Sequence, residues 1–190
     1  MQNVNWNKLR DLAHQTSVDH GFYEDKPSNI HFLCLIVSEL MEAVEADRKN
    51  HRAKIRPSYD TPRYSMFSDQ TFHCGNVYFK ENFEVQIKNT LEDELADVVI
   101  RCLDLAGANN IDILFGNPPA IRNQGNTLTE KVWYISGVLT DHTVPLTTKL
   151  NTTIRHCFQL SREYGIDLLW HIEKKMMYNT LRSKKHGKRY

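Results

Sequence analysis

Apolar residues recur every three or four positions through most of the chain, the spacing typical of amphipathic helices. Asn5 and Ser28 stand where helix caps are expected, and Gly21 stands where a helix would end. No stretch has the alternating pattern of a strand. The pattern therefore predicts an all-α helical bundle, and a four-helix core is the arrangement we expect. The predicted helices cover residues 6–20, 28–48, 84–108, 128–140, 146–164 and 167–182.

Two segments interrupt this period. Residues 51–83 contain two prolines, Gly75 and several aromatic residues, and they predict a lid, a small hairpin or a long packed loop. Residues 112–127 contain Pro118, Pro119 and two glycines, which indicate a connector. We expect one all-α domain over residues 1–190 with insertions at these two places.

Composition narrows the class of protein. The chain has 190 residues, 41% of them hydrophobic, which is enough for one domain with a real core. Its net charge of +1 predicts no general attraction to nucleic acid or to a membrane. The four cysteines lack zinc-site spacing, and no secretory signal precedes the first helix, so we expect a cytoplasmic protein. The basic end from Arg182 to Tyr190 is interpreted as a solvated tail or a partner-binding tail.

Two pairs of acids lie inside the two most apolar predicted helices. Glu39 and Glu42 are three residues apart, as are Glu94 and Asp97, so each pair lies on one helical face. If the helices pack together, the four carboxylates converge, and each pair of charges at about 6 Å repels by roughly 3 kcal/mol at an effective dielectric near 20. A cation between them would remove this repulsion.

The residues around these acids indicate burial. Glu39 is flanked on the helical wheel by apolar side chains, and Glu94 lies beside the core-facing stripe of its helix. A polar seam of Thr90, Asp97, Arg101 and Asp104 continues along the edge of that stripe. Carboxylates in such surroundings take up protons or bind a cation, and a hard divalent ion such as Mg²⁺ suits an all-oxygen set. The alternative is an ordinary seam of salt bridges with Arg101 or with lysines.

The last predicted helix carries complementary chemistry. Lys175, Asn179 and Arg182 stand at positions i, i+4 and i+7, on one stripe that suits a polyphosphate. The alternative is that basic residues near a helix end complement the helix dipole.

These elements together resemble the MazG-like all-α nucleoside triphosphate pyrophosphohydrolases. The resemblance lies in three motifs: Ser38-Glu39-Leu-Met-Glu42-Ala-Val-Glu45, Asp93-Glu94-Leu-Ala-Asp97-Val-Val-Ile-Arg101, and Lys175-Met-Met-Tyr-Asn179-Thr-Leu-Arg182. The first acid of a common Glu-Glu pair is replaced here by Ser38, and the connectors are longer than usual.

The resemblance implies hydrolysis of a ribo- or deoxyribonucleoside triphosphate to the monophosphate and pyrophosphate, in house-cleaning or nucleotide-pool control. It implies Mg²⁺, with Mn²⁺ as a substitute, held by Glu39, Glu42, Glu94 and Asp97 as metal ligands and catalytic acids. Glu45 would be a further catalytic acid. It also implies that Lys175, Asn179 and Arg182 bind the phosphates, and that the chain forms a homodimer or homotetramer.

Another class of protein also fits the sequence. A non-catalytic helical interaction protein would use the acids as a structural seam and the basic tail to bind RNA or protein. No nucleic-acid motif supports the RNA-binding form of this alternative, and no nucleic-acid or membrane partner is expected. A di-iron carboxylate bundle is excluded because the chain has no Glu-x-x-His pair. The residues that recognise the base stay unassigned, with His20, Phe22 and the aromatic residues of 59–83 as the places to examine.

Overall fold

The structure is a computed structural model that describes residues 4–55, 76–114 and 125–187. Within these ranges it is all-helical and contains no strand, which confirms the all-α class for this part of the chain. The helices are α1 (Trp6–Asp19), α2 (Asn29–Arg48), α4 (Asn76–Gln86), α5 (Leu91–Ala108), α6 (Leu128–Thr140), α7 (Leu146–Glu163), α8 (Leu168–Thr180) and the short 3-10 helix η2 (Lys184–Gly187).

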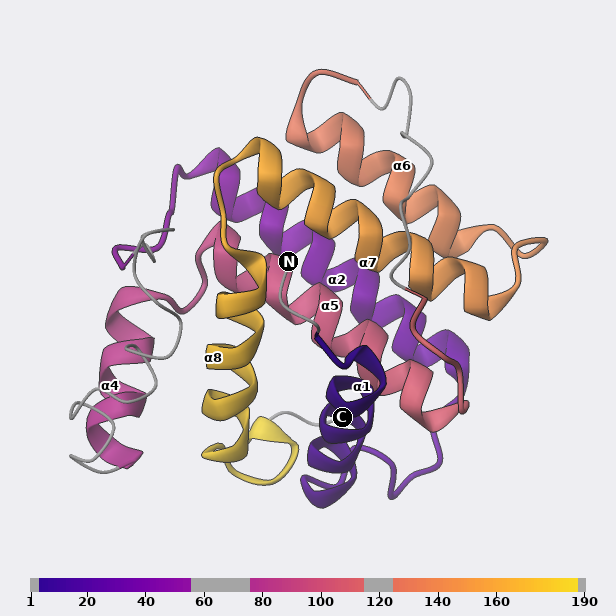
Figure 1. The fold of residues 1–190 in the computed structure, drawn as a ribbon, viewed down its shortest axis with the longest axis horizontal. Coiled ribbons are helices and arrows are strands. Elements are labelled where there is room, and N and C mark those ends of the chain that lie inside the picture. Colours follow the sequence, from indigo (N-terminus) through magenta and orange to yellow (C-terminus); the bar gives the residue numbers. More distant parts are fainter. Residues whose placement is uncertain (1–3, 56–75, 115–124, 188–190) are drawn as a thin grey trace.

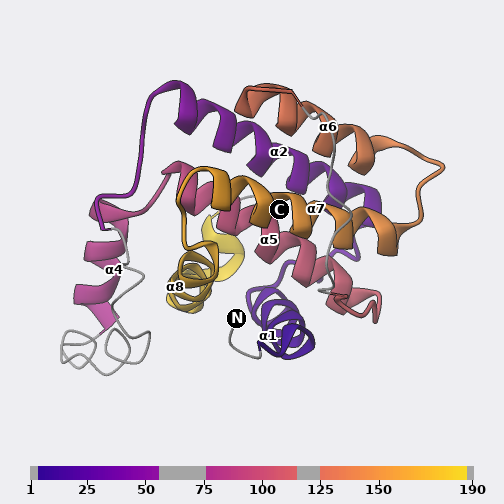
Figure 2. The ribbon, with the colours of Figure 1, turned by 45° about the horizontal axis from the view of Figure 1, so that its top comes forward.

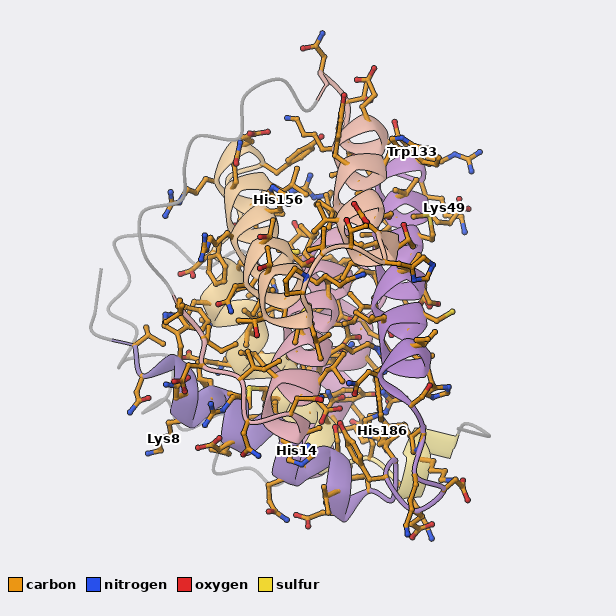
Figure 3. All side chains as sticks on the ribbon, turned by 90° about the vertical axis from the view of Figure 1, so that its right-hand side faces the viewer. Lys8, His14, Lys49, Trp133, His156 and His186 are labelled. Carbon is orange, nitrogen blue, oxygen red and sulfur yellow. The ribbon has the colours of Figure 1, made fainter. Side chains whose placement is uncertain are left out.

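Helix α5 is the central element. It contacts α1, α2, α7 and α8, and it is buried on nearly every side, as a helix with apolar residues around most of its surface must be. Helix α6 packs on the outside against α2 and α7, while α4 lies beside α8 (Figures 1 and 2). The outer side of α6 exposes Trp133, which is labelled in Figure 3. None of the described helices is long and apolar enough to cross a membrane.

The predicted helix over residues 84–108 is wrong as a single element. The structure divides it into the end of α4 and the whole of α5, separated at residues 87–90. Asn89 has a positive φ of 61°, and the Thr90 side chain caps α5 by accepting a hydrogen bond from the Asp93 amide. In return, the Asp93 carboxylate accepts a hydrogen bond from the Asn89 amide at 2.9 Å. The apolar stripe continues across this break, so hydrophobic spacing alone does not reveal it. The pair Asn89-Thr90 is nevertheless a capping signal that marks the start of a new helix.

The two predicted interruptions are described only in part. Residues 51–55 are irregular, as expected, but residues 76–83 belong to α4, so the predicted irregular segment extends too far. Residues 56–75 and 115–124, where much of both predicted insertions falls, lie outside the described residues. The aromatic side chains of α4 pack on α8, where the Phe83 ring stacks on Tyr178 with centroids 4.3 Å apart.

Helix α1 crosses the C-terminal end of α5 at Gly107. A Cβ atom built on Gly107 would lie 2.5 Å from the His14 Cβ, so only a glycine permits this approach. The crossing brings His14 and the turn after α1 against the polar seam of α5, where Asp104 lies 3.0 Å from the His14 ring.

Candidate functional site

Three of the four predicted metal ligands converge between α2 and α5. Oxygen atoms of Glu39, Glu94 and Asp97 all lie within 4.8 Å of one another. Glu39 is 3% exposed and Glu94 is 4% exposed. Both helices present these acids inward because the acids share a face with buried apolar residues of their own helix. The predicted burial of Glu39 and Glu94 is therefore confirmed.

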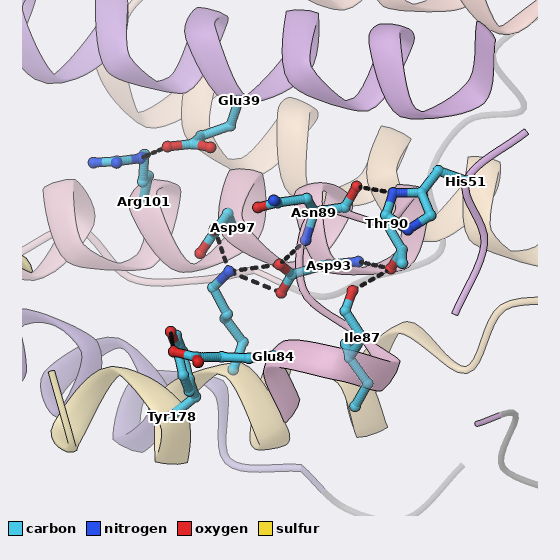
Figure 4. Close-up of polar contacts among 11 residues, drawn as sticks. Glu39, His51, Glu84, Ile87, Asn89, Thr90, Asp93, Asp97, Arg101 and Tyr178 are labelled. Carbon is cyan, nitrogen blue, oxygen red and sulfur yellow. Dashed lines mark hydrogen bonds and ion pairs between the residues drawn. The ribbon is translucent and has the colours of Figure 1, made fainter. Parts of the chain in front are cut away.

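Two cations, the partly buried Arg101 and the buried Lys175, bind acids of this region (Figure 4). The Arg101 Nε donates to Glu39 Oε1 at 2.5 Å. Lys175, from α8, donates to both oxygens of Asp93 at 2.8 Å and forms an ion pair with Asp97 Oδ2 at 2.7 Å. These contacts link α2, α5 and α8 through a single charged network.

Burial governs the protonation of the network. Burial raises the pKa of Glu94 to about 9, and the charges of Asp97 and Asp93 add to the rise. Burial also raises the pKa of Glu39, with Asp97 adding to the rise and Arg101 opposing it. The pKa of Asp93 is raised to about 6 by burial, which Lys175 offsets only in part. Burial opposes the charge of Lys175, but the carboxylates of Asp97 and Asp93 hold its pKa above its ordinary value.

The net negative charge of the network favours binding of a divalent cation. When fully ionised, the carboxylates of Glu39, Asp93, Glu94 and Asp97 exceed the two cations by two negative charges, which one divalent ion would neutralise. Oxygen ligands on opposite sides of Mg²⁺ are about 4.2 Å apart, given bonds of about 2.1 Å. The three converging acids, with oxygen atoms within 4.8 Å, therefore need only small side-chain movements to fit such an ion.

A pocket of about 60 Å³ opens beside the acids. Glu39, Asp97 and Arg101 line it together with Asn179 and Arg182. Its complete lining is Ser17, Phe22, Phe32, Glu39, Asp97, Ile100, Arg101, Asp104, Asn179, Arg182 and His186. One pocket thus combines candidate metal ligands with two of the three predicted phosphate-binding residues.

Asn179 and Arg182 reach this pocket in different ways. Asn179 lies in the last turn of α8 and is 8% exposed, and its Oδ1 has no hydrogen-bond partner among the described residues. Arg182 follows the helix, and its guanidinium group lies 5.6 Å from the centre of the Tyr178 ring. The His20 Nε2 lies 3.1 Å from the Arg182 carbonyl oxygen. Because a carbonyl oxygen only accepts hydrogen bonds, the His20 ring is the donor.

The basic end of the chain forms one wall of the site. Lys184 pairs with Glu24, and Lys185 pairs with Asp25, each at 2.7 Å. The Lys185 amide also donates to the His20 carbonyl at 2.8 Å. These lysines are therefore bound to the turn after α1 instead of forming a free tail, while residues 188–190 lie outside the described ranges.

The remaining predicted site residues lie elsewhere. Glu42 is exposed on α2 and accepts a hydrogen bond from Ser38 Oγ at 3.4 Å, so it is not part of the converging triad. Glu45 is also exposed and pairs with Arg48 and Lys49 at 3.0 and 3.1 Å. Lys175 is directed at carboxylates, which differs from the phosphate-binding position expected of it.

The structure adds residues to which the sequence had assigned no role in the site. Asp93 lies four residues before Asp97, on the same helical face, and this spacing was a signal that it would share a partner with Asp97. Phe32 and His186 enter the pocket only through the packing of α2 and η2 around it, which no local pattern predicts. Phe22, an expected place for base recognition, does line the pocket.

Comparisons with family models, with curated proteins and with solved structures find no significant match to this chain.

Proposed function

We propose that this protein is a divalent-cation-dependent nucleotide pyrophosphohydrolase that converts a nucleoside triphosphate and water to the monophosphate and pyrophosphate. The observation that carries the proposal is one pocket that is lined by the buried Glu39 and the partly buried Asp97 and also by the polyphosphate-compatible residues Asn179 and Arg182. The motif resemblance to the MazG-like enzymes supports the same reaction.

The acid end of the pocket suits a Mg²⁺ or Mn²⁺ ion. Glu39, Glu94 and Asp97 would hold it, and the ion would neutralise phosphate charge and lower the pKa of a bound water. Arg101 fixes the Glu39 carboxylate, and Lys175 fixes that of Asp97, so both acids are held in place before any ligand enters. Such fixed carboxylates lose little conformational freedom when a cation binds.

Two other residues of the pocket lining, Asn179 and Arg182, suit phosphate oxygens. The guanidinium group of Arg182 can bind two phosphate oxygens at once, and the Asn179 side-chain amide can donate to a third. The Asn179 Oδ1 is buried without a partner among the described residues, and because it is an acceptor, only a hydrogen-bond donor on a ligand could recover that cost.

The ion pairs favour a second candidate, in which the acids are structural only. Arg101 and Lys175 already compensate part of the charge of Glu39, Asp93 and Asp97, as a seam of salt bridges would. The other half of that alternative, a basic tail free to bind a partner, is disfavoured because Lys184 and Lys185 bind Glu24 and Asp25.

Pyrophosphate release distinguishes these candidates. The protein is incubated with Mg²⁺ and a panel of ribo- and deoxyribonucleotides, and pyrophosphate is measured. We expect turnover that EDTA abolishes and that Asp97→Asn and Glu39→Gln each lower by at least about a hundredfold. Asp11→Asn, which removes an exposed acid of α1 that pairs with Arg10, should leave turnover unchanged.

A folded protein that releases no pyrophosphate from any nucleotide would reject the proposal. Folding of each variant is checked by circular dichroism, so that lost activity is not confused with lost structure. Titration of Mn²⁺ without nucleotide gives a second test, because a purely structural seam predicts no saturable binding.

A further inference from the structure

A buried carboxylate that lines the pocket has one oxygen engaged in two contacts. Asp104 lies on α5, is 6% exposed and lines the pocket. Its Oδ1 accepts a hydrogen bond of 2.7 Å from the Tyr23 hydroxyl, and the His14 Nδ1 lies 3.0 Å from the same oxygen. Among the described residues no hydrogen bond to Oδ2 is present. The second oxygen of a buried carboxylate is thus left for the pocket.

The residues around Asp104 hold it rigidly. His14 lies where α1 crosses Gly107, the closest approach between these helices. The Tyr23 ring stacks on Phe32, with ring centroids 4.8 Å apart, and it meets the His14 ring edge-on. An acceptor fixed in this way is preorganised for a ligand, because its side chain loses little conformational freedom when the ligand binds.

Asp104 and Asp97 both line the pocket. They are seven residues apart on α5, which places them on nearly the same helical face and about 10 Å apart along the axis. If the phosphates lie against Asp97, this separation places the nucleoside end of the substrate near Asp104. Phe22 lines the same pocket, so it also contains an aromatic ring.

We propose that Asp104 is a specificity-determining residue that accepts a hydrogen bond from the amino group of a nucleobase. A carboxylate is only an acceptor, so it favours a base edge that carries an amine and repels a carbonyl oxygen at the same position. The inference rests on the proposed function, because it takes the phosphates to lie at the Asp97 end.

Pairs of nucleotides that differ in one functional group of the base test whether Asp104 selects an amino group. CTP carries an amino group where UTP carries a carbonyl, and ATP and ITP differ in the same way. We expect kcat/KM to favour the amino member of a pair by at least about tenfold, the range for a site built to bind one donor. Asp104→Asn should remove this preference mainly by lowering kcat/KM for the amino nucleotide. Mn²⁺ binding in the absence of nucleotide should stay unchanged.

Asp104→Glu is the matched control, because it keeps the acceptor and should keep the direction of the preference even where activity falls. An equal loss on every nucleotide in Asp104→Asn would overturn the inference and indicate a sugar contact or a structural role. A wild-type protein that hydrolyses both members of each pair equally well would overturn it without any variant.

Failure of this inference differs from failure of the proposed function. If the wild type releases no pyrophosphate, the hydrolase proposal fails, and binding of CMP against UMP still tests Asp104 without turnover. Tighter binding of CMP by at least about tenfold, lost in Asp104→Asn, is the expected result. Equal affinities for the two monophosphates would overturn the assignment of Asp104.

Discussion

Lys175 Nζ lies 2.7 Å from Asp97 Oδ2, so a predicted phosphate ligand and a predicted metal ligand bind each other. The same ammonium group lies 2.8 Å from Asp93, whose side chain is 1% exposed. This relationship makes Lys175 a structural partner of the acids and a means of fixing Asp97. In the proposed function, the phosphate contacts are then assigned to Asn179 and Arg182, which line the pocket.

Removing the lysine should destabilise the fold. Lys175→Met leaves Asp93 buried without its cation, and breaking a buried ion pair from one side costs about 3 to 5 kcal/mol. We expect urea unfolding, followed by circular dichroism, to show a loss of this size. The double variant Lys175→Met/Asp93→Asn should recover most of it, because the fully buried charge of Asp93 is removed and Asp97, with its side chain 18% exposed, keeps access to solvent. A single variant as stable as the wild type would contradict the assigned role of this ion pair.

Neutralising Glu94 should stabilise the metal-free protein at high pH. Its folded pKa of about 9 lies above the 4.5 of an ordinary glutamate, so its contribution to stability is complete below about pH 4.5 and is lost as the pH rises toward 9. Glu94→Gln removes this loss, and we expect it to raise the free energy of unfolding at pH 8 by about 2 kcal/mol or more.

The advantage of Glu94→Gln should shrink to nothing near pH 4, where the wild-type side chain is already protonated. Thermal unfolding in EDTA at pH 4, 6 and 8 provides the comparison. An advantage that is the same at every pH would mean that packing, not the carboxylate charge, accounts for it.

Metal binding should release protons. At neutral pH a carboxyl group with a pKa of about 9 carries a proton, which a metal ion must displace before Glu94 can ligate it. We expect the affinity for Mn²⁺ to rise by about tenfold per pH unit between pH 6 and 8. Calorimetry in two buffers of different ionisation enthalpy would measure the release directly. Binding that is independent of pH would exclude Glu94 as a ligand.

Arg101 competes with a cation for the charge of Glu39. Arg101→Met should destabilise the metal-free protein by about 3 kcal/mol, because it leaves Glu39 buried and unpaired. The same change removes a positive charge beside the site, so Mn²⁺ should raise the melting temperature more in the variant than in the wild type. If Mn²⁺ stabilises neither protein, the acids form a structural seam. Asp11→Asn again serves as the control.

Local patterns were sufficient for most helices and for the burial of the acids. The predicted helix over residues 128–140 agrees with α6, and Ser28 caps α2 as expected. The apolar flanks of Glu39 and Glu94 predicted two buried carboxylates, and the structure confirms both. Such features depend on residues within a few turns of each other, so the spacing of apolar residues along the sequence is enough to predict them.

Tertiary packing decided the rest. The same three-residue spacing places Glu39 in the converging triad and leaves Glu42 exposed, because the position of α5 determines which acid of the pair faces inward. The stripe of Lys175, Asn179 and Arg182 is likewise divided, since Lys175 meets Asp93 and Asp97 while the other two reach the pocket. By itself the sequence determined most of the helices and the burial of Glu39 and Glu94. The partner of each charge depended on how α2, α5 and α8 meet, because an ion pair between distant segments is set by three-dimensional distance and not by spacing along the chain.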